Sequence, residues 1–255
     1  LQDAGWYCRD ELIWFKPNPM PSSARDRTCP AHEMVYLLAK QPRYYFDDIA
    51  ILEDSSPKTR PGRKDGKTIN PIDGGNGFDR RPGTLHRSLR PTKRMRRSVW
   101  SINPEPCRDA HFATFPTKLI LPMIEASTSE VGVCVHCGAP FQRISRKETD
   151  PSPADPAFVS YSYITTGWRP SCNCRNPKPV PAIVLDPFGG TGTVGSVSNS
   201  IGRDAILIEL NADYVDIARN RLETAGYEPA VERIRSTKPE CRGGPLDARH
   251  AGMGR

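Results

Sequence analysis

The stretch that decides the fold reads Val184-Leu185-Asp186-Pro187-Phe188-Gly189-Gly190-Thr191-Gly192-Thr193. Apolar residues from 183 to 185 precede the acid and predict a buried strand. Helical spacing of apolar residues over 194–201 predicts a helix directly after the glycine turn. A second apolar strand over 205–208 and a second helix over 214–222 follow. This order of elements predicts a βαβα unit of an α/β fold.

The predicted unit is suited to a nucleoside ligand. Its glycines let the backbone approach a ligand, and Glu209 ends the second strand, where an acid accepts hydrogen bonds from ribose hydroxyls. Residues 190–195 match the dinucleotide pattern G-x-G-x-x-G, but Asp186 would face a bound pyrophosphate with like charge. An acid here suits an α-ammonium or a sulfonium, and S-adenosylmethionine carries both. A dinucleotide site and an unrelated nucleotide-like turn are the alternatives.

The position of the turn in the chain indicates a permuted order of elements. Only 60 of the 255 residues follow Gly195, too few to complete a sheet, so the remaining strands must lie upstream. Strand-favouring residues predict strands at 9–15 and 32–40. Prolines at alternate positions 17, 19 and 21 follow the first of these strands. They predict a rigid extended exit from it that holds Lys16 and Asn18 outward.

The turn and its flanks resemble the cofactor motif of amino-group DNA methyltransferases, which modify adenine N6 or cytosine N4. Further stretches resemble the same family, namely Ile13–Pro21, His32–Lys40, Arg97–Trp100 and His111–Leu119. The permuted (β) class of that family carries its cofactor motif near the C-terminus. The resemblance implies a Rossmann-like S-adenosylmethionine-dependent methyltransferase sheet, permuted and incomplete at the N-terminus, with a small zinc-knuckle insertion.

The resemblance also implies the roles of the site residues. Asp186 would face the ammonium of the methionine moiety, the turn at 188–193 would cradle that moiety, and Glu209 would hold the ribose. A helix beginning at Pro116 would line the cofactor, and Pro122 is expected to kink or shorten it. The expected cofactor-binding residues are therefore Phe115, Pro116, Asp186, Pro187, Phe188, Gly189, Gly190, Thr191, Gly192, Thr193 and Glu209.

The catalytic motif of this family, D/S-P-P followed by an aromatic residue, has no counterpart here. No Pro-Pro dipeptide occurs in the 255 residues, so no catalytic residue is assigned. In the permuted class the motif lies upstream of the other motifs, and we expect it to precede Leu1. The chain is then the C-terminal, cofactor-binding part of a DNA methyltransferase, completed by a separate N-terminal fragment or a second copy. The alternative is a non-catalytic zinc-containing DNA-binding remnant of such an enzyme.

Positive charge is concentrated in one segment of a chain whose net charge is +7. From Lys58 to Arg97 there are 13 Lys or Arg residues against three Asp residues. Such a local excess favours a polyanion, here double-stranded DNA, and residues 53–97 are the candidate target-recognition region, predicted as a flexible basic loop. A solvated basic loop without a partner is the alternative.

Four of the eight cysteines have the spacing of metal ligands. Cys134 and Cys137 form a C-x-x-C-G turn, and Cys172 and Cys174 form a C-x-C pair downstream. Two close pairs of thiolates suit a tetrahedral structural Zn²⁺. A strand expected near 158–164 makes a small zinc-ribbon hairpin the predicted form of this insertion, with a DNA-contact role left open.

No apolar run approaches the ~20 residues of a membrane span, and no stretch has the form of a signal peptide, so a cytoplasmic protein without membrane contact is expected. Six regions are predicted along the chain. They are DNA-facing sheet strands (1–52), the basic loop (53–97), the cofactor-lining helix (98–130), the zinc insertion (131–178), the cofactor-binding βαβα unit (179–226) and a disordered basic tail (227–255).

Overall fold

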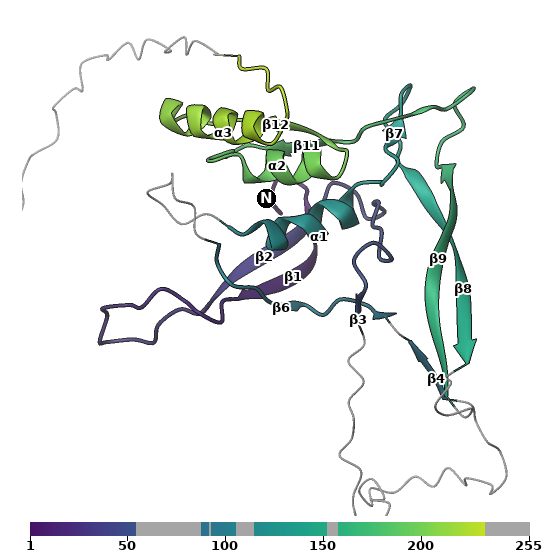
Figure 1. Cartoon of the computed structure of the whole chain (residues 1–255), viewed down its shortest axis with the longest axis horizontal. Helices are drawn as coiled ribbons and strands as arrows, with labels where there is room; N and C mark the ends of the chain where they lie inside the picture. Colours follow the sequence, from purple (N-terminus) through teal and green to yellow (C-terminus); the bar gives the residue numbers. More distant parts are fainter. Residues whose placement is uncertain (55–87, 92, 106–114, 152–157, 233–255) are drawn as a thin grey trace, which may run out of the picture.

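The structure is a computed structural model, which describes residues 1–54, 88–91, 93–105, 115–151 and 158–232 (Figure 1). Its helices are α1 (Thr117–Ser127), α2 (Thr193–Ser200) and α3 (Ala212–Thr224). Its strands are β1 (Tyr7–Phe15), β2 (His32–Ala39), β3 (Glu53–Asp54), β4 (Ser88–Pro91), β5 (Lys93–Arg94), β6 (Val99–Ser101), β7 (Val133–Cys134), β8 (Phe141–Pro151), β9 (Phe158–Pro170), β10 (Pro179–Val180), β11 (Ile183–Asp186) and β12 (Asp204–Leu207).

The first sheet has the strand order β2-β1-β6. β1 pairs antiparallel with β2 and parallel with β6, so Ile13 lies beside both Met34 and Val99. Trp14 lies on the opposite face, buried with Trp100, and its indole N–H donates to the carbonyl of Ile102 at 2.8 Å. Both strands predicted in this part of the sequence are present.

The βαβα unit predicted around the glycine turn is present. β11 and β12 pair in parallel, with Asp186 beside Leu207 at their carboxyl ends. α2 covers one face of this pair because Val194 and Val197 pack with Val184 and Leu207. α3 follows β12, and its Ala218 lies against the first turn of α2.

Helix α1 joins the cores of the two sheets. Its Leu119 packs with the tryptophans of the first sheet, and its Ile124 packs with α2. Pro116 is the N-cap rather than the first helical residue, and the helix continues through the buried Pro122 to Ser127. Of the expected kink or shortening at Pro122, the shortening does not occur, because burial of both faces of α1 compensates for the one backbone hydrogen bond that proline removes.

A long β-hairpin stands apart from the two sheets (Figure 1). It consists of β8 and β9, which pair antiparallel with a bulge between Ile144 and Ser145. β4 adds to it by pairing in parallel with β9, and β3 pairs with β5. Both ends of the predicted basic loop therefore form strands, which corrects that prediction for the described residues. Residues 55–87 and 92 lie outside them, as does most of the predicted tail, 233–255.

One face of the β11–β12 pair is apolar and exposed. The side that points away from α2 presents four large aliphatic residues, each more than half exposed: Ile183, Leu185, Ile206 and Ile208. Parallel strands normally have both faces covered. The uncovered apolar face is therefore relevant to whether the sheet is complete.

Among the described residues no helix is long and apolar enough to cross a membrane.

Candidate cofactor site and cysteine cluster

The carboxylate of Asp186 lies where β11 ends and the glycine turn begins. Its Oδ1 accepts a hydrogen bond from the backbone N–H of Phe188 at 3.0 Å. Its Oδ2 is buried and has no hydrogen-bond partner among the described residues. A buried acceptor without a partner is costly, so this oxygen requires a donor from outside the described chain.

Glu209 shapes the turn from the end of β12. Its Oε2 accepts from the backbone N–H of Gly190 at 2.7 Å, and its Oε1 accepts from that of Asn211 at 2.8 Å. The turn is closed further by the backbone N–H of Gly189, which donates to the carbonyl of Ile208 at 2.8 Å. Each carboxylate oxygen has a second lone pair, so Glu209 retains the capacity to accept from ribose hydroxyls.

The turn enters α2 through a residue that must be glycine. Gly192 is the N-cap, with φ +79, and a Cβ atom added to it would lie 2.9 Å from the Cβ of Ala218. Arg221 of α3 holds the same turn, because its Nη1 donates to the carbonyl of Thr191 at 2.6 Å and to its hydroxyl at 2.8 Å. Arg221 belongs to the stretch that resembles the methyltransferase motif, but its positioning role depends on a contact across 30 residues.

The remaining predicted cofactor residues are only partly brought together. Phe188 projects from the turn and is 85% exposed, whereas Thr191 and Thr193 are buried. Pro116 is buried, whereas Phe115 is exposed at the start of α1. Ile124 of α1 is buried with residues of α2, Ile120 packs against the same cluster, and Phe115 does not belong to it, so this packing does not itself bring Phe115 to Asp186. The preceding residues 106–114 lie outside the described residues.

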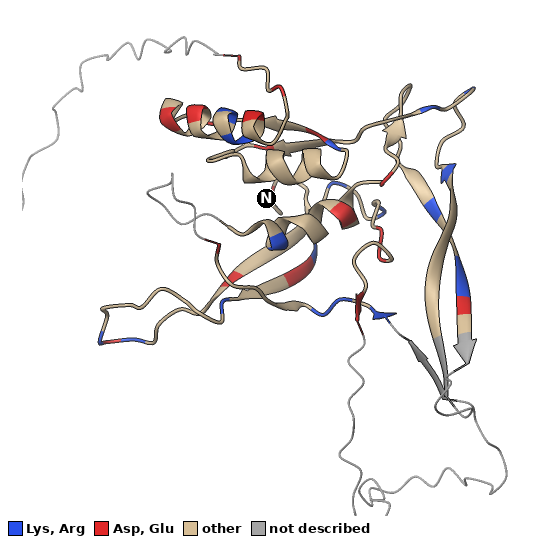
Figure 2. Cartoon of the chain, viewed as in Figure 1, with Lys and Arg blue, Asp and Glu red and all other residues tan. Residues whose placement is uncertain are grey.

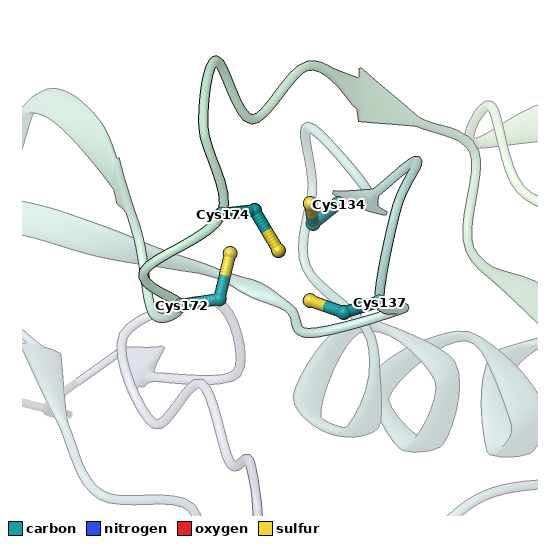
Figure 3. A group of neighbouring side chains, drawn as sticks. All are labelled: Cys134, Cys137, Cys172 and Cys174. Atoms are coloured by element: carbon teal, nitrogen blue, oxygen red, sulfur yellow. The ribbon is translucent and has the colours of Figure 1, made fainter.

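The four predicted metal ligands converge in space (Figure 3). The sulfur atoms of Cys134, Cys137, Cys172 and Cys174 all lie within 4.8 Å of one another. A tetrahedral zinc with Zn–S bonds of about 2.3 Å needs sulfur separations of about 3.8 Å, so small rotations of the side chains suffice. Gly138, with φ +71, folds the backbone under the first pair, and its N–H donates to the carbonyl of Cys134 at 2.8 Å.

The thiols of the cluster do not ionise equally. Backbone N–H groups at 136 and 137 lower the pKa of Cys134 to about 7, against the effect of burial. Hydrogen bonding to the neighbouring Cys137 and Cys172 sulfurs raises the pKa of Cys174 to about 12. Four thiolates this close together repel one another, which opposes ionisation of all four thiols. A bound divalent cation offsets that repulsion.

Some cations of the predicted DNA-facing segments form ion pairs within the protein. The Nε atoms of Arg94 and Arg97 both lie within 3.0 Å of Glu53. Lys16, expected to project outward, forms an ion pair with Glu33 and lies over the ring of Trp14. A linear sequence pattern does not show such cross-strand partners. The β8–β9 hairpin carries further Lys and Arg side chains, interrupted on β8 by one acid (Figure 2).

A family model described as DNA methylase, that of the N6 and N4 enzymes, matches residues 1–136 and 177–220. The chain belongs to this family of DNA amino-methyltransferases. The resemblance identified from the sequence motifs is confirmed at that level. The match is interrupted at 137–176, the part that contains the β8–β9 hairpin and three of the four cysteines of the cluster.

Curated relatives support this membership. The chain is 34% identical over 234 residues to the type II methyltransferase M.Cfr9I of Citrobacter freundii, covering 92% of this chain and 50% of that protein. It is 32% identical over 234 residues to M.XycI of Xanthomonas campestris pv. cyanopsidis, with the same coverage. The chain therefore spans about half the length of these relatives.

Solved methyltransferase structures are more loosely similar. The M1.HpyAVI–SAM complex is 18% identical with a TM-score of 0.40, covering 87% of this chain and 64% of that one. The PvuII DNA methyltransferase (cytosine-N4-specific) is 16% identical with a TM-score of 0.45, covering 86% and 52%. Such scores transfer no residue's role to this DNA methylase.

Proposed function

We propose that this chain is the cofactor-binding part of a permuted DNA amino-methyltransferase, which transfers a methyl group from S-adenosylmethionine to adenine N6 or cytosine N4 of double-stranded DNA. The unpartnered Oδ2 of Asp186 carries the proposal. The cofactor's α-ammonium is a cationic donor that would satisfy this oxygen, and a pyrophosphate would be repelled by it.

The other residues of the site are assigned roles in binding. The turn at 188–193 would cradle the methionine moiety, Glu209 would accept from the ribose hydroxyls, and Arg221 holds the turn in place. Phe115 and Pro116 line the cofactor from the start of α1. Bound S-adenosylmethionine supplies the electrophilic methyl group on its sulfonium, and the residues named here orient it and shield it from water.

The catalytic D/S-P-P-aromatic motif is proposed to lie outside residues 1–255, in a separate fragment or a longer form of the protein. Three observations support this. No Pro-Pro dipeptide occurs in the sequence, the chain spans about half of its curated relatives, and the exposed aliphatic face of β11–β12 is suited to cover by further structure.

The cysteine cluster is proposed to bind one structural Zn²⁺. Four converging sulfurs without an open coordination position match a structural rather than a catalytic site. The proposed division of the chain follows from these assignments, with 179–226 as the cofactor unit, 131–178 as the zinc insertion and 53–97 as the DNA-contacting segment.

Calorimetry with S-adenosylmethionine tests the cofactor assignment. Asp186→Asn keeps the shape of the side chain but removes its charge. We expect it to weaken binding by roughly 10- to 100-fold, the value of one charge-assisted hydrogen bond of about 1.5–3 kcal/mol. Methylthioadenosine lacks the ammonium, so its affinity should be the same for the parent chain and D186N.

Asp204→Asn is the matched control, since Asp204 lies at the opposite end of the same strand pair and is exposed. It should bind the cofactor as the parent does. Equal weakening of both ligands in D186N would show a folding defect rather than the absence of an ammonium bond. Salt-sensitive DNA binding without any cofactor binding by the parent would instead favour the non-catalytic DNA-binding remnant.

A further inference from the structure

The β8–β9 hairpin is an addition to the family's common structure, because the family match is interrupted at 137–176. Its two strands run side by side over eleven and thirteen residues and project from the body (Figure 1). The cysteine cluster lies at the root of both strands. Cys137 precedes β8 and Cys172 follows β9, so a metal bound there would join the two strands at their root (Figure 3).

A buried ion pair anchors the root at a second point. Arg143 of β8 lies 3.0 Å from Asp47 and 2.7 Å from Glu130, and the side chain of Asp47 is only 3% exposed. Arg143 also donates to the hydroxyl of Thr165 on β9 at 2.6 Å. The backbone N–H of Asp47 in turn donates to the carbonyl of Ala126 at the end of α1. The hairpin is therefore held at a defined orientation to α1.

Cations and aromatic rings alternate along one face of the hairpin. The antiparallel register places Arg143 opposite Trp168 and Lys147 opposite Tyr163. The guanidinium of Arg143 lies 4.4 Å from the ring centre of Trp168, and the ammonium of Lys147 lies 3.8 Å from that of Tyr161.

Further cations belong to the same two strands. Arg146 and Arg169 are exposed. Glu148 is the one acid among the described side chains of β8 and β9. The arm therefore carries a net positive charge along its length.

A third strand, from the basic stretch of the sequence, adds to the hairpin. β4, which is residues 88–91, pairs in parallel with 158–161 of β9. The 13 cations between Lys58 and Arg97 flank this strand or belong to it. A two-stranded ribbon has the width that the DNA major groove admits, and its cations suit the phosphates on either side.

We infer that the β8–β9 hairpin is a zinc-rooted arm that binds duplex DNA through the cations of its two strands. The inference rests on the proposed function for the identity of the partner. It assigns the metal a role in DNA affinity that is separate from cofactor binding, because no residue of the cofactor site belongs to the arm.

The test uses the full 255-residue chain and a fluorescent duplex of about 30 base pairs of mixed sequence, roughly three turns of DNA. The arm variant R146Q/K147Q removes two exposed cations of β8. Its control, K118Q/R219Q, removes an exposed and a half-exposed cation of helices α1 and α3. We expect the arm variant to bind DNA roughly tenfold or more weakly, and the slope of log K against log salt to fall by about 0.9 for each phosphate that the variant no longer neutralises. The affinity of the control should fall less than about threefold.

Metal dependence is tested on the same chain. Mass spectrometry should find one zinc per chain in the parent and in the arm variant, and none in C172S/C174S. Chelation of the parent should lower DNA affinity by roughly tenfold or more, and added Zn²⁺ should restore it, while calorimetry with S-adenosylmethionine is unchanged throughout. Equal DNA affinity of the arm and control variants would contradict the proposal that the hairpin binds DNA. DNA affinity that is insensitive to zinc would contradict the role proposed for the metal. Failure of the proposed function has a different signature, namely the absence of cofactor binding in the parent.

Discussion

At the scale of single residues, the turn at 188–193 depends on differences that a sequence pattern does not show, among its glycines and between the two acids that end the adjacent strands. Glycines at 189, 190 and 192 signal a turn, but of these only Gly192 combines a left-handed backbone with a neighbour that excludes a side chain. Acids at 186 and 209 end adjacent strands, but Glu209 is engaged with the turn's backbone whereas one oxygen of Asp186 is left without a partner among the described residues. The two acids therefore have different tasks.

Gly192→Ala should lower the free energy of unfolding by about 2–3 kcal/mol, from backbone strain and the clash with Ala218. Gly226→Ala is the control, because Gly226 has φ +85 but open space around its Cα. It should cost only the strain, about 1 kcal/mol. Urea unfolding measures both, and calorimetry should show weakened cofactor binding in G192A alone. Equal losses of stability would show that the clash is relieved without cost.

Glu125 of α1 gives a pH dependence. Burial raises its pKa above the ordinary value, and the nearby Arg203 and Arg96 only partly oppose this. The native state therefore binds this proton more tightly than the unfolded state, so ionisation of Glu125 costs stability as the pH rises above about 4.3. Glu125→Gln should be more stable than the parent at about pH 7, and the difference should vanish below about pH 4.

Urea midpoints between about pH 4 and pH 8 measure this difference, with Glu223→Gln as the control at an exposed position of α3. That variant should follow the parent at every pH. If E125Q were less stable than the parent at about pH 7, the attraction of Glu125 to Arg203 would outweigh its burial, and the predicted sign would be wrong.

At the scale of elements, α1 and the hairpin are positioned by contacts that cross the chain. Arg203 shows how α1 is fixed, because its Nε donates to the hydroxyl of Thr128 just beyond the helix at 3.1 Å. Arg143 performs the equivalent task for the hairpin. Hydrogen bonds to Asp47 and Glu130 raise its pKa although burial opposes the charge.

Arg143→Met should lower the free energy of unfolding by about 3–5 kcal/mol, because Asp47 is left buried and unpaired. The double variant D47N/R143M removes that charge and should recover part of the loss. Arg146→Met, at an exposed position on the same strand, should change stability by about 0.5 kcal/mol or less. Thermal unfolding measures all three, and a double variant no more stable than R143M would contradict the buried-charge explanation.

At the scale of the whole molecule, the proposed cofactor site is not accompanied by a D/S-P-P-aromatic motif within the 255 residues. We expect the purified 255-residue chain to transfer no tritiated methyl group to mixed-sequence duplex DNA above a blank without enzyme. Cofactor binding in the same preparation, measured by calorimetry, is the control that the site is folded. Robust turnover by this chain alone would contradict the proposal that the catalytic residues lie elsewhere.

The sequence by itself determined the elements whose causes are local. The strands at 7–15, 32–39, 183–186 and 204–207 follow from strand-favouring or apolar runs, and the glycine turn follows from its own residue types. The cysteine pairs also indicated their convergence, because the metal-ligand spacing within each pair is local. These features need no knowledge of the chain's path.

Only the tertiary structure decided the features that join distant segments. Arg143 meets Asp47 across 96 residues, and Arg221 meets Thr191 across 30. β4 joins β9 from the segment predicted to be a loop, and Glu53 neutralises cations predicted to reach DNA. Side-chain pairing and strand addition depend on which surfaces packing brings together, and a linear pattern carries little of that information.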